Sequence, residues 1–242
     1  MPTGREPNYL YLTIGLLAAV VLATSAGGQI LFAIVGVLVA GITFMVTAWF
    51  VIESKRQFGL VGALALTALL PFIWLVGRPD EQFPGLIERL YLLNLTIWLL
   101  FTADIAIVVF RNIMSAKRIR ANEIYGAIYV YLLIGVIFAE LFQLLLAGNP
   151  GALFFDPGRF PEPLTVQHNS FLTRSFGDLL YYSFVTLGTV GYGDVTPASP
   201  AARSLSLIEA VIGIMYVATM IARFVSIQTS NNSRNEETSL KE

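Results

Sequence analysis

Long apolar runs separated by short polar segments dominate this 242-residue chain. A helix of about 20 apolar residues is long enough to cross a hydrocarbon core about 30 Å thick. Runs of this length predict six transmembrane helices, at about 8–26, 29–52, 57–77, 86–110, 122–147 and 202–228. The first run is long and the segment before it is barely cationic, so we expect a retained helix rather than a signal peptide. The predicted fold class is an all-α membrane protein.

The segment between the last two runs breaks this pattern. Residues 148–170 are rich in Pro and Gly and are not expected to be helical. The next apolar stretch, "SFGDLLYYSFVTL" at 175–187, would reach only about halfway across a membrane as a helix. Ser175, with Asp178 three positions later, predicts its N-cap, and Gly188 predicts its C-terminal end. The pattern therefore predicts a re-entrant half-helix.

The stretch "TLGTVGYGD" follows at 186–194. Non-helical backbone at membrane depth is tolerated only where protein buries it or water fills a cavity beside it. Gly191 and Gly193 alternate with Val190 and Tyr192, which permits a positive φ at every second residue and carbonyls that point the same way. Such a row of carbonyls can replace the hydration shell of a cation, and the C-terminal end of the half-helix adds partial negative charge. The sequence therefore predicts a cation pathway.

These residues also carry a family resemblance. The stretch "LLYYSFVTLGTVGYGDVTP" resembles the pore helix, selectivity filter and following aspartate of tetrameric potassium channels, in the bacterial type with six transmembrane helices. The resemblance covers residues 122–228 and implies a homotetramer in which K⁺ is the permeant ion and no other cofactor is needed. By this resemblance, dehydrated K⁺ would be coordinated by Thr189, Val190, Gly191, Tyr192 and Gly193. A Gly-rich turn and a weak phosphate loop are the less favoured interpretations of the stretch.

The resemblance extends to residues around the filter. Gly188 and Val185 replace a threonine and a supporting glutamate that members of the family carry. The residues expected to support the filter are Tyr181, Tyr182, Thr186, Asp194 and Glu209. The residues expected to form a hinge and a hydrophobic gate in the last helix are Gly213, Ile214, Val217, Ile221 and Val225.

Glu209 is an acid at the predicted depth of the filter, on the same helix face as Ser206 and Gly213. We hypothesise that it replaces the missing glutamate by contacting the hydroxyls of Tyr181, Tyr182 or Thr186, or the backbone of the half-helix. The alternative is a protonated acid that only packs between helices.

Residues 1–121 form a predicted module of four helices that resembles a voltage-sensor domain without its charges. A sensor needs Arg or Lys at every third position of one helix. The fourth predicted helix offers only Arg89, Asp104 and Arg111, so we do not expect voltage gating. Asp104 is an intramembrane acid and so a candidate for a functional role, but we expect it to meet Arg111 or a basic loop residue, and we expect Glu140 to have a wet or hydrogen-bonded structural role. Residues 122–228 form the predicted pore domain, and residues 229–242 a disordered cytoplasmic tail.

Composition agrees with a membrane protein: 56% of the residues are hydrophobic and 13% are charged. The net charge of −1 gives no reason to expect nucleic acid as a partner. The chain has no cysteine and one histidine, His168, so most catalytic and zinc constellations are unavailable and we do not expect an enzyme. Ten of the fifteen Lys and Arg residues lie inside if both termini are cytoplasmic, so this orientation is predicted. The expected location is the plasma (inner) membrane, as a multi-pass protein.

The predicted function is passive, potassium-selective conduction through a homotetramer in the lipid bilayer. The alternatives are a weakly selective cation channel, a secondary K⁺ transporter and a non-conducting regulatory membrane subunit. A transporter of this type would be expected to carry four related filter segments in one chain, whereas this chain has one. A regulatory subunit would not need an intact filter.

Overall fold

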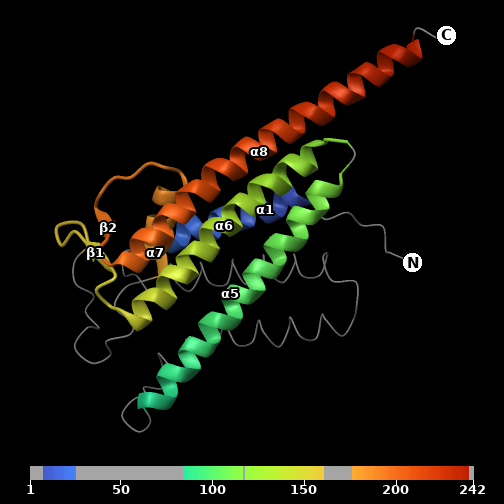
Figure 1. Cartoon of the computed structure of the whole chain (residues 1–242). Coiled ribbons are helices and arrows are strands. Elements are labelled where there is room, and N and C mark those ends of the chain that lie inside the picture. The colour runs from blue at the N-terminus through green and yellow to red at the C-terminus, as the bar shows by residue number, and fades with distance from the viewer. Residues whose placement is uncertain (1–7, 26–83, 117, 161–175, 240–242) are drawn as a thin grey trace.

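The computed structural model describes residues 8–25, 84–116, 118–160 and 176–239. Its elements are helices and one pair of short strands (Figure 1). In chain order they are α1 (Tyr9–Ser25), α5 (Pro84–Ser115), α6 (Ala121–Gly148), β1 (Leu153–Phe155), α7 (Phe176–Leu187), β2 (Val195–Pro197) and α8 (Pro200–Ser239). The predicted spans at 29–52 and 57–77 lie outside the described residues.

Three described helices are long and apolar enough to cross a membrane: Tyr91–Ser115 within α5, Ala121–Gly148, and Pro200–Thr229 within α8. Helix α1 is also apolar but shorter. Each of these four helices overlaps a span predicted from the sequence. The mostly helical structure with membrane-length apolar helices is consistent with the predicted all-α membrane protein.

Helix α6 lies at the centre and packs against α1, α5, α7 and α8. Its apolar residues are spaced around the whole helix, as expected for a helix with neighbours on several sides. Tyr129, Leu133, Ala139 and Phe142 are fully buried, and they join Val109 of α5 in one core. The fold thus places the half-helix α7 and the long helix α8 on a single apolar scaffold.

Helix α1 reaches both α6 and α7. At its start, the Tyr9 amide donates to Asn122 Oδ1 over 2.9 Å, and the Thr13 hydroxyl donates to the carbonyl of Tyr125 over 2.9 Å. At its end, the carbonyl of Ala23 lies against the first turn of α7, where only the absence of a side chain at Gly177 leaves room. The N-terminal module and the predicted pore domain therefore touch within one chain.

The strands β1 and β2 pair antiparallel, with Phe154 opposite Thr196. The segment from Asn149 to Phe160 that contains β1 is non-helical, as predicted, but the strand pairing was not predicted. The amides of Ala198 and Ser199 both donate to the carbonyl of Ala152, which extends the pairing beyond β2. This small sheet ties the segment after α6 to the segment that precedes α8.

Helix α8 differs from the prediction at its C-terminal end. It continues as helix to Ser239, whereas residues 229–242 were expected to be disordered. A helix that is already nucleated gains one hydrogen bond per added residue without a new nucleation cost, so it can extend into polar sequence. Its 40 residues exceed the length needed to cross a membrane, and Figure 1 shows its last turns projecting beyond the other helices.

Candidate functional site

The site is centred on the segment that follows α7. The half-helix begins at Phe176, directly after the predicted N-cap Ser175, which lies outside the described residues, and it ends at Leu187. Asp178 lies in its first turn, where an acidic residue is favourable. Length and position agree with the predicted half-helix. Gly188 follows its last residue, as expected, but its φ is not positive.

Three alternate residues of the segment have a positive φ: Thr189 at 54°, Gly191 at 61° and Gly193 at 79°. The sequence predicted this conformation for the two glycines, and the prediction is confirmed. Thr189 was missed because it is not a glycine, although it continues the same alternation. A left-handed residue at every second position turns successive carbonyls the same way, which is the backbone geometry that a row of cation ligands requires.

Helix α7 anchors the start of this segment through its own backbone. The amide of Val190 donates to the carbonyl of Val185 over 2.9 Å, and the amide of Gly191 points to the same oxygen at 3.4 Å. The amide of Thr189 donates to the carbonyl of Thr186 over 2.9 Å. Val185 and Thr186 thus hold the segment with main-chain oxygens. The missing glutamate side chain at 185 is not needed for this contact.

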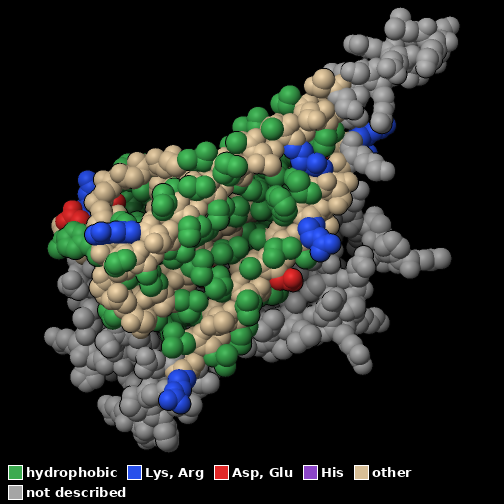
Figure 2. Space-filling view, viewed as in Figure 1, with side chains coloured by type: hydrophobic (Ala, Val, Ile, Leu, Met, Phe, Trp, Pro, Cys, Tyr) green, Lys and Arg blue, Asp and Glu red, His purple; other side chains and the backbone are tan. Residues whose placement is uncertain are grey.

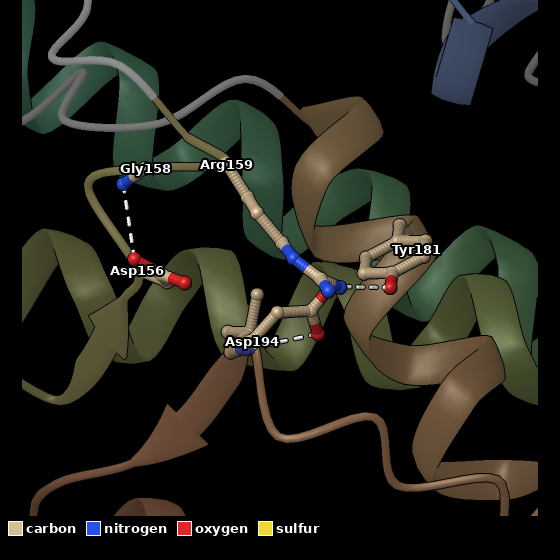
Figure 3. A network of polar contacts seen from close by, with 6 residues as sticks. Asp156, Gly158, Arg159, Tyr181 and Asp194 are labelled. Atoms are coloured by element: carbon tan, nitrogen blue, oxygen red, sulfur yellow. Dashed lines mark hydrogen bonds and ion pairs between the residues drawn. The ribbon is translucent and has the colours of Figure 1, made fainter.

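Asp194 fixes the other end of the segment (Figure 3). Its Oδ2 accepts a 2.6 Å hydrogen bond from the Tyr181 hydroxyl and lies 3.4 Å from Arg159 Nη1. Its Oδ1 accepts from the amide of Val195, and its carbonyl accepts from the amide of Asp156. Asp194 therefore links α7, the segment after β1, and β2.

The charge state of Asp194 follows from these contacts. Burial of its carboxyl opposes ionisation, but hydrogen bonds from Tyr181, from the amides of Asp194 and Val195, and from Arg159 outweigh burial and lower its pKa below the ordinary value. Asp194 is thus a carboxylate at neutral pH. The sequence predicted its supporting position but not Arg159 as a partner.

The two tyrosines predicted to support the filter face different neighbours. The ring of Tyr181 stacks on the ring of Tyr192 with centroids 6.4 Å apart and planes 6° apart. The hydroxyl of Tyr182 forms a 2.7 Å hydrogen bond with Ser206 of α8. Tyr181 therefore connects α7 to the segment itself, and Tyr182 connects α7 to the last helix.

One face of α8 packs on α7 at three successive levels, as the spacing of Ser206, Glu209 and Gly213 predicted. Ser206 meets Tyr182, and the fully buried Glu209 lies 2.5 Å from the hydroxyl of Ser183. The prediction of the partner was wrong in detail, because the hydroxyl comes from Ser183 rather than from Tyr181, Tyr182 or Thr186. Ser183 was missed because a small polar residue inside an apolar helix carries no pattern of its own.

Gly213 forms the third level. A β-carbon at this position would lie 2.5 Å from the carbonyl oxygen of Leu187, so the glycine permits close contact between the two helices. The same carbonyl accepts a 3.4 Å hydrogen bond from the Tyr131 hydroxyl of α6. Helix α8 is continuous through Gly213, so the structure gives this glycine a packing role and does not test the predicted hinge.

The residues predicted to form the gate lie on an open face of α8. Ile214, Val217, Ile221 and Val225 are all exposed in the single chain. Between Ile221 and Val225, Arg223 turns toward the N-terminal module, where its Nη2 donates to the carbonyls of Met114 and Ala116 at the end of α5. A cation at the carbonyl end of a helix is favourable. No pattern in the sequence indicates this contact.

Two acids in the apolar helices behave differently. Glu140 of α6 is buried and accepts a 3.1 Å hydrogen bond from Thr102 of α5, which confirms its predicted hydrogen-bonded role. Asp104 is exposed and forms no ion pair within the described ranges, so the expected partner Arg111 is not in contact. Because Asp104 is exposed and lies seven residues from Arg111, its carboxylate does not require Arg111 as a partner.

Comparison with known proteins identifies the domain that contains this site. Residues 129–230 match the family model described as "Ion channel". The chain is 44% identical over 54 residues to Two pore potassium channel c of Oryza sativa subsp. japonica, covering 22% of this chain and 12% of that protein. It is 28% identical over 136 residues to the Voltage-gated potassium channel Kch of Escherichia coli K12, covering 55% of this chain and 28% of that protein.

A third relative, Protein LctB of Bacillus caldotenax, is 26% identical over 147 residues, covering 60% of this chain and 95% of that protein. The chain spans less than a third of the length of each of the two potassium channels named above. No solved structure matches the chain significantly. The matches identify an ion channel domain related to potassium channels, and they confirm the prediction of a non-enzymatic membrane protein.

Proposed function

We propose, from the ion channel domain at residues 129–230, that the chain is a subunit of a potassium-selective channel of the six-helix type. The observation that carries the proposal is the alternation of positive φ at Thr189, Gly191 and Gly193, directly after a half-length helix. This backbone turns its carbonyls the same way, and carbonyl rings of this kind replace the hydration shell of K⁺. Residues 189–193 are then the ion-binding segment.

The ligands in this proposal are main-chain oxygens. No group of three His, Asp or Glu side chains that could hold a metal ion occurs in the described part of the chain. Asp194, the acid nearest to the segment, is occupied by Tyr181, Arg159 and the Val195 amide. Tyr181, Tyr182, Thr186 and Asp194 support the segment from outside it and leave its carbonyls free.

A homotetramer is the second part of the proposal. Val190 and Tyr192 are more than half exposed in the single chain, and only 17% of the apolar window of α8 is buried, compared with 56% for α6. One chain supplies one filter segment, so a closed ring of four copies is needed to surround an ion. The copies would cover the exposed face of α8, and its apolar side chains at 214, 217, 221 and 225 would line the pathway below the filter.

The remaining proposals concern gating and topology. Described helix α5 carries no ladder of positive charges, which supports a channel that is not gated by voltage. An apolar constriction at the gate residues can close by dewetting, and Gly213 would be the point where α8 bends. The chain is proposed to lie in the plasma membrane. Both termini are proposed to lie in the cytoplasm, because that orientation puts most basic residues inside.

Planar-bilayer recording of the purified protein tests the proposal. With opposed gradients of K⁺ and Na⁺, the reversal potential should follow the K⁺ gradient, and the mass of the particle in detergent should equal four chains. Equal permeability to K⁺ and Na⁺ would instead indicate the weakly selective cation channel. Absence of any current from intact tetramers would indicate the regulatory subunit.

A further inference from the structure

Three helices meet at a buried polar contact behind the filter segment. The hydroxyl of Ser183 in α7 lies 2.7 Å from the carbonyl oxygen of Gly135 in α6 and 2.5 Å from Glu209 Oε1 in α8. Ser183 and Glu209 are both fully buried. The contact therefore joins the outer helix, the half-helix and the last helix at one point.

Counting protons decides the charge of Glu209. A carbonyl oxygen can only accept a hydrogen bond, so the proton between Ser183 and Gly135 comes from the serine hydroxyl. Serine has a single O–H, so it has no proton left for its contact with Glu209. The hydrogen bond between Ser183 and Glu209 then requires a proton on the carboxyl group.

The surroundings of Glu209 agree with a neutral acid. Within the described ranges no cationic side chain pairs with it, and its Oε2 has no hydrogen-bond partner. The titratable groups that interact electrostatically with it are the phenols of Tyr131 in α6 and Tyr182 in α7, which are uncharged at neutral pH. A buried carboxylate with no cation and one hydrogen bond would be strongly destabilising.

We propose that Glu209 is held as the neutral acid and donates to Ser183, which donates to the carbonyl of Gly135. Ser183 is then a positioning residue: it fixes α7, and with it the filter segment, between α6 and α8. The relay does this without a fixed negative charge behind the filter. This inference rests on the proposed channel function for its purpose, but not for its geometry.

Infrared spectroscopy of the purified protein tests the protonation directly. A neutral carboxyl has a C=O stretching band that a carboxylate lacks. We expect that Glu209→Gln removes a band of this kind, and that Ser183→Ala shifts it because the hydrogen bond is lost. Glu140→Gln is the matched control, a second buried glutamate whose replacement should leave the Glu209 band in place. Identical carboxyl bands in the wild-type and Glu209→Gln proteins would show that Glu209 is ionised and would overturn the proposal.

Thermal unfolding of the same proteins tests the positioning role. Gln can donate from its amide to Ser183, so Glu209→Gln should unfold near the wild-type temperature. Glu209→Leu removes one buried hydrogen bond and Ser183→Ala removes two, so each variant should lower the midpoint by at least about 4 °C. A Leu variant as stable as the Gln variant would contradict the relay. Neither readout needs conduction, so failure of the proposed channel function would leave both results interpretable.

Discussion

Gly213 and the carbonyl oxygen of Leu187 are in close contact across the interface between α8 and α7, and a β-carbon on Gly213 would lie 2.5 Å from that oxygen. Leu187 is the last residue of the half-helix that leads into the filter segment. The position of the inner helix and the base of the filter are therefore fixed against each other by backbone atoms.

This contact makes Gly213→Ala a test of packing. The added methyl group must push α8 away from α7, which should destabilise the assembly by about 1–3 kcal/mol and weaken K⁺ selectivity. Thermal unfolding and reversal potentials measure the two effects. Gly148→Ala is the matched control, because a β-carbon there meets nothing within 4 Å. If Gly213→Ala changed only the open probability at full stability, the glycine would act as a hinge and not as a packing residue.

The filter glycines should not tolerate a side chain for a different reason. Gly191 and Gly193 have open space around the position of a β-carbon, but their φ values are 61° and 79°. Alanine at a positive φ costs roughly 1 kcal/mol or more and would turn the carbonyl away from the ion. We expect Gly191→Ala and Gly193→Ala to abolish selective conduction in bilayer recordings. Retained K⁺ selectivity in either variant would exclude carbonyl coordination at that residue.

Asp194 predicts a dependence of stability on pH. Its pKa is lowered in the folded protein by Tyr181, backbone amides and Arg159, which together outweigh burial, so its contribution to stability is present above the ordinary value of 3.8. That contribution is lost as the pH falls through the lowered pKa. In Tyr181→Phe the pKa should rise toward the ordinary value, so the fall in the unfolding midpoint between about pH 6 and about pH 3 should be smaller than in wild type. Overlapping pH profiles would show that the Tyr181 hydroxyl does not stabilise the carboxylate.

Arg223 connects the lower part of α8 to the end of α5, and its replacement should loosen that connection. In Arg223→Gln the carbonyls of Met114 and Ala116 lose a charged donor. The chain has no cysteine, so spin labels can be placed at introduced cysteines without background. With labels at Asn112 and Ser226, diluted among unlabelled subunits, the distance distribution should broaden. Arg118→Gln, at an exposed position in the α5–α6 connector, is the control and should leave the distance distribution unchanged. An unchanged distribution in Arg223→Gln would show that the contact has no mechanical role.

The proposed gate predicts the effect of one charge. Ile221 is 58% exposed in the single chain, on the open face of α8. If these side chains close an apolar constriction in the assembly, Ile221→Asp should keep the constriction wet and raise the basal current. Ile221→Leu preserves the apolar surface and should behave like wild type. An unchanged current in Ile221→Asp would place the gate elsewhere in the molecule.

The sequence pattern was sufficient to predict the backbone conformation of the two filter glycines and the helices that surround the site. Apolar runs predicted α5, α6 and α8 because each must cover about a membrane thickness, and the alternation of Gly191 and Gly193 predicted the left-handed conformation. Spacing on one helix face also predicted that Ser206, Glu209 and Gly213 would meet α7.

Partners contributed by distant segments could not be predicted in the same way. Ser183 and Arg223 have no sequence pattern that identifies their acceptors, the carbonyls of Gly135, Met114 and Ala116. Those acceptors are main-chain atoms, which every residue carries, so only the packing of the helices selects them. The pairing of β1 with β2 was missed because each strand has three residues, too few to show an alternation.

The contact between Ala23 of α1 and Gly177 of α7 has a consequence for biosynthesis. About 150 residues separate the two positions, whereas α5 and α6 are neighbours along the chain and can pair as soon as both have left the ribosome. Helix α1 is made before α7 and cannot complete its packing until the half-helix has been translated. During that interval its apolar face must be shielded by lipid or by the insertion machinery. Packing of α1 within one subunit is therefore completed only when the half-helix arrives, after α5 and α6 have already been made.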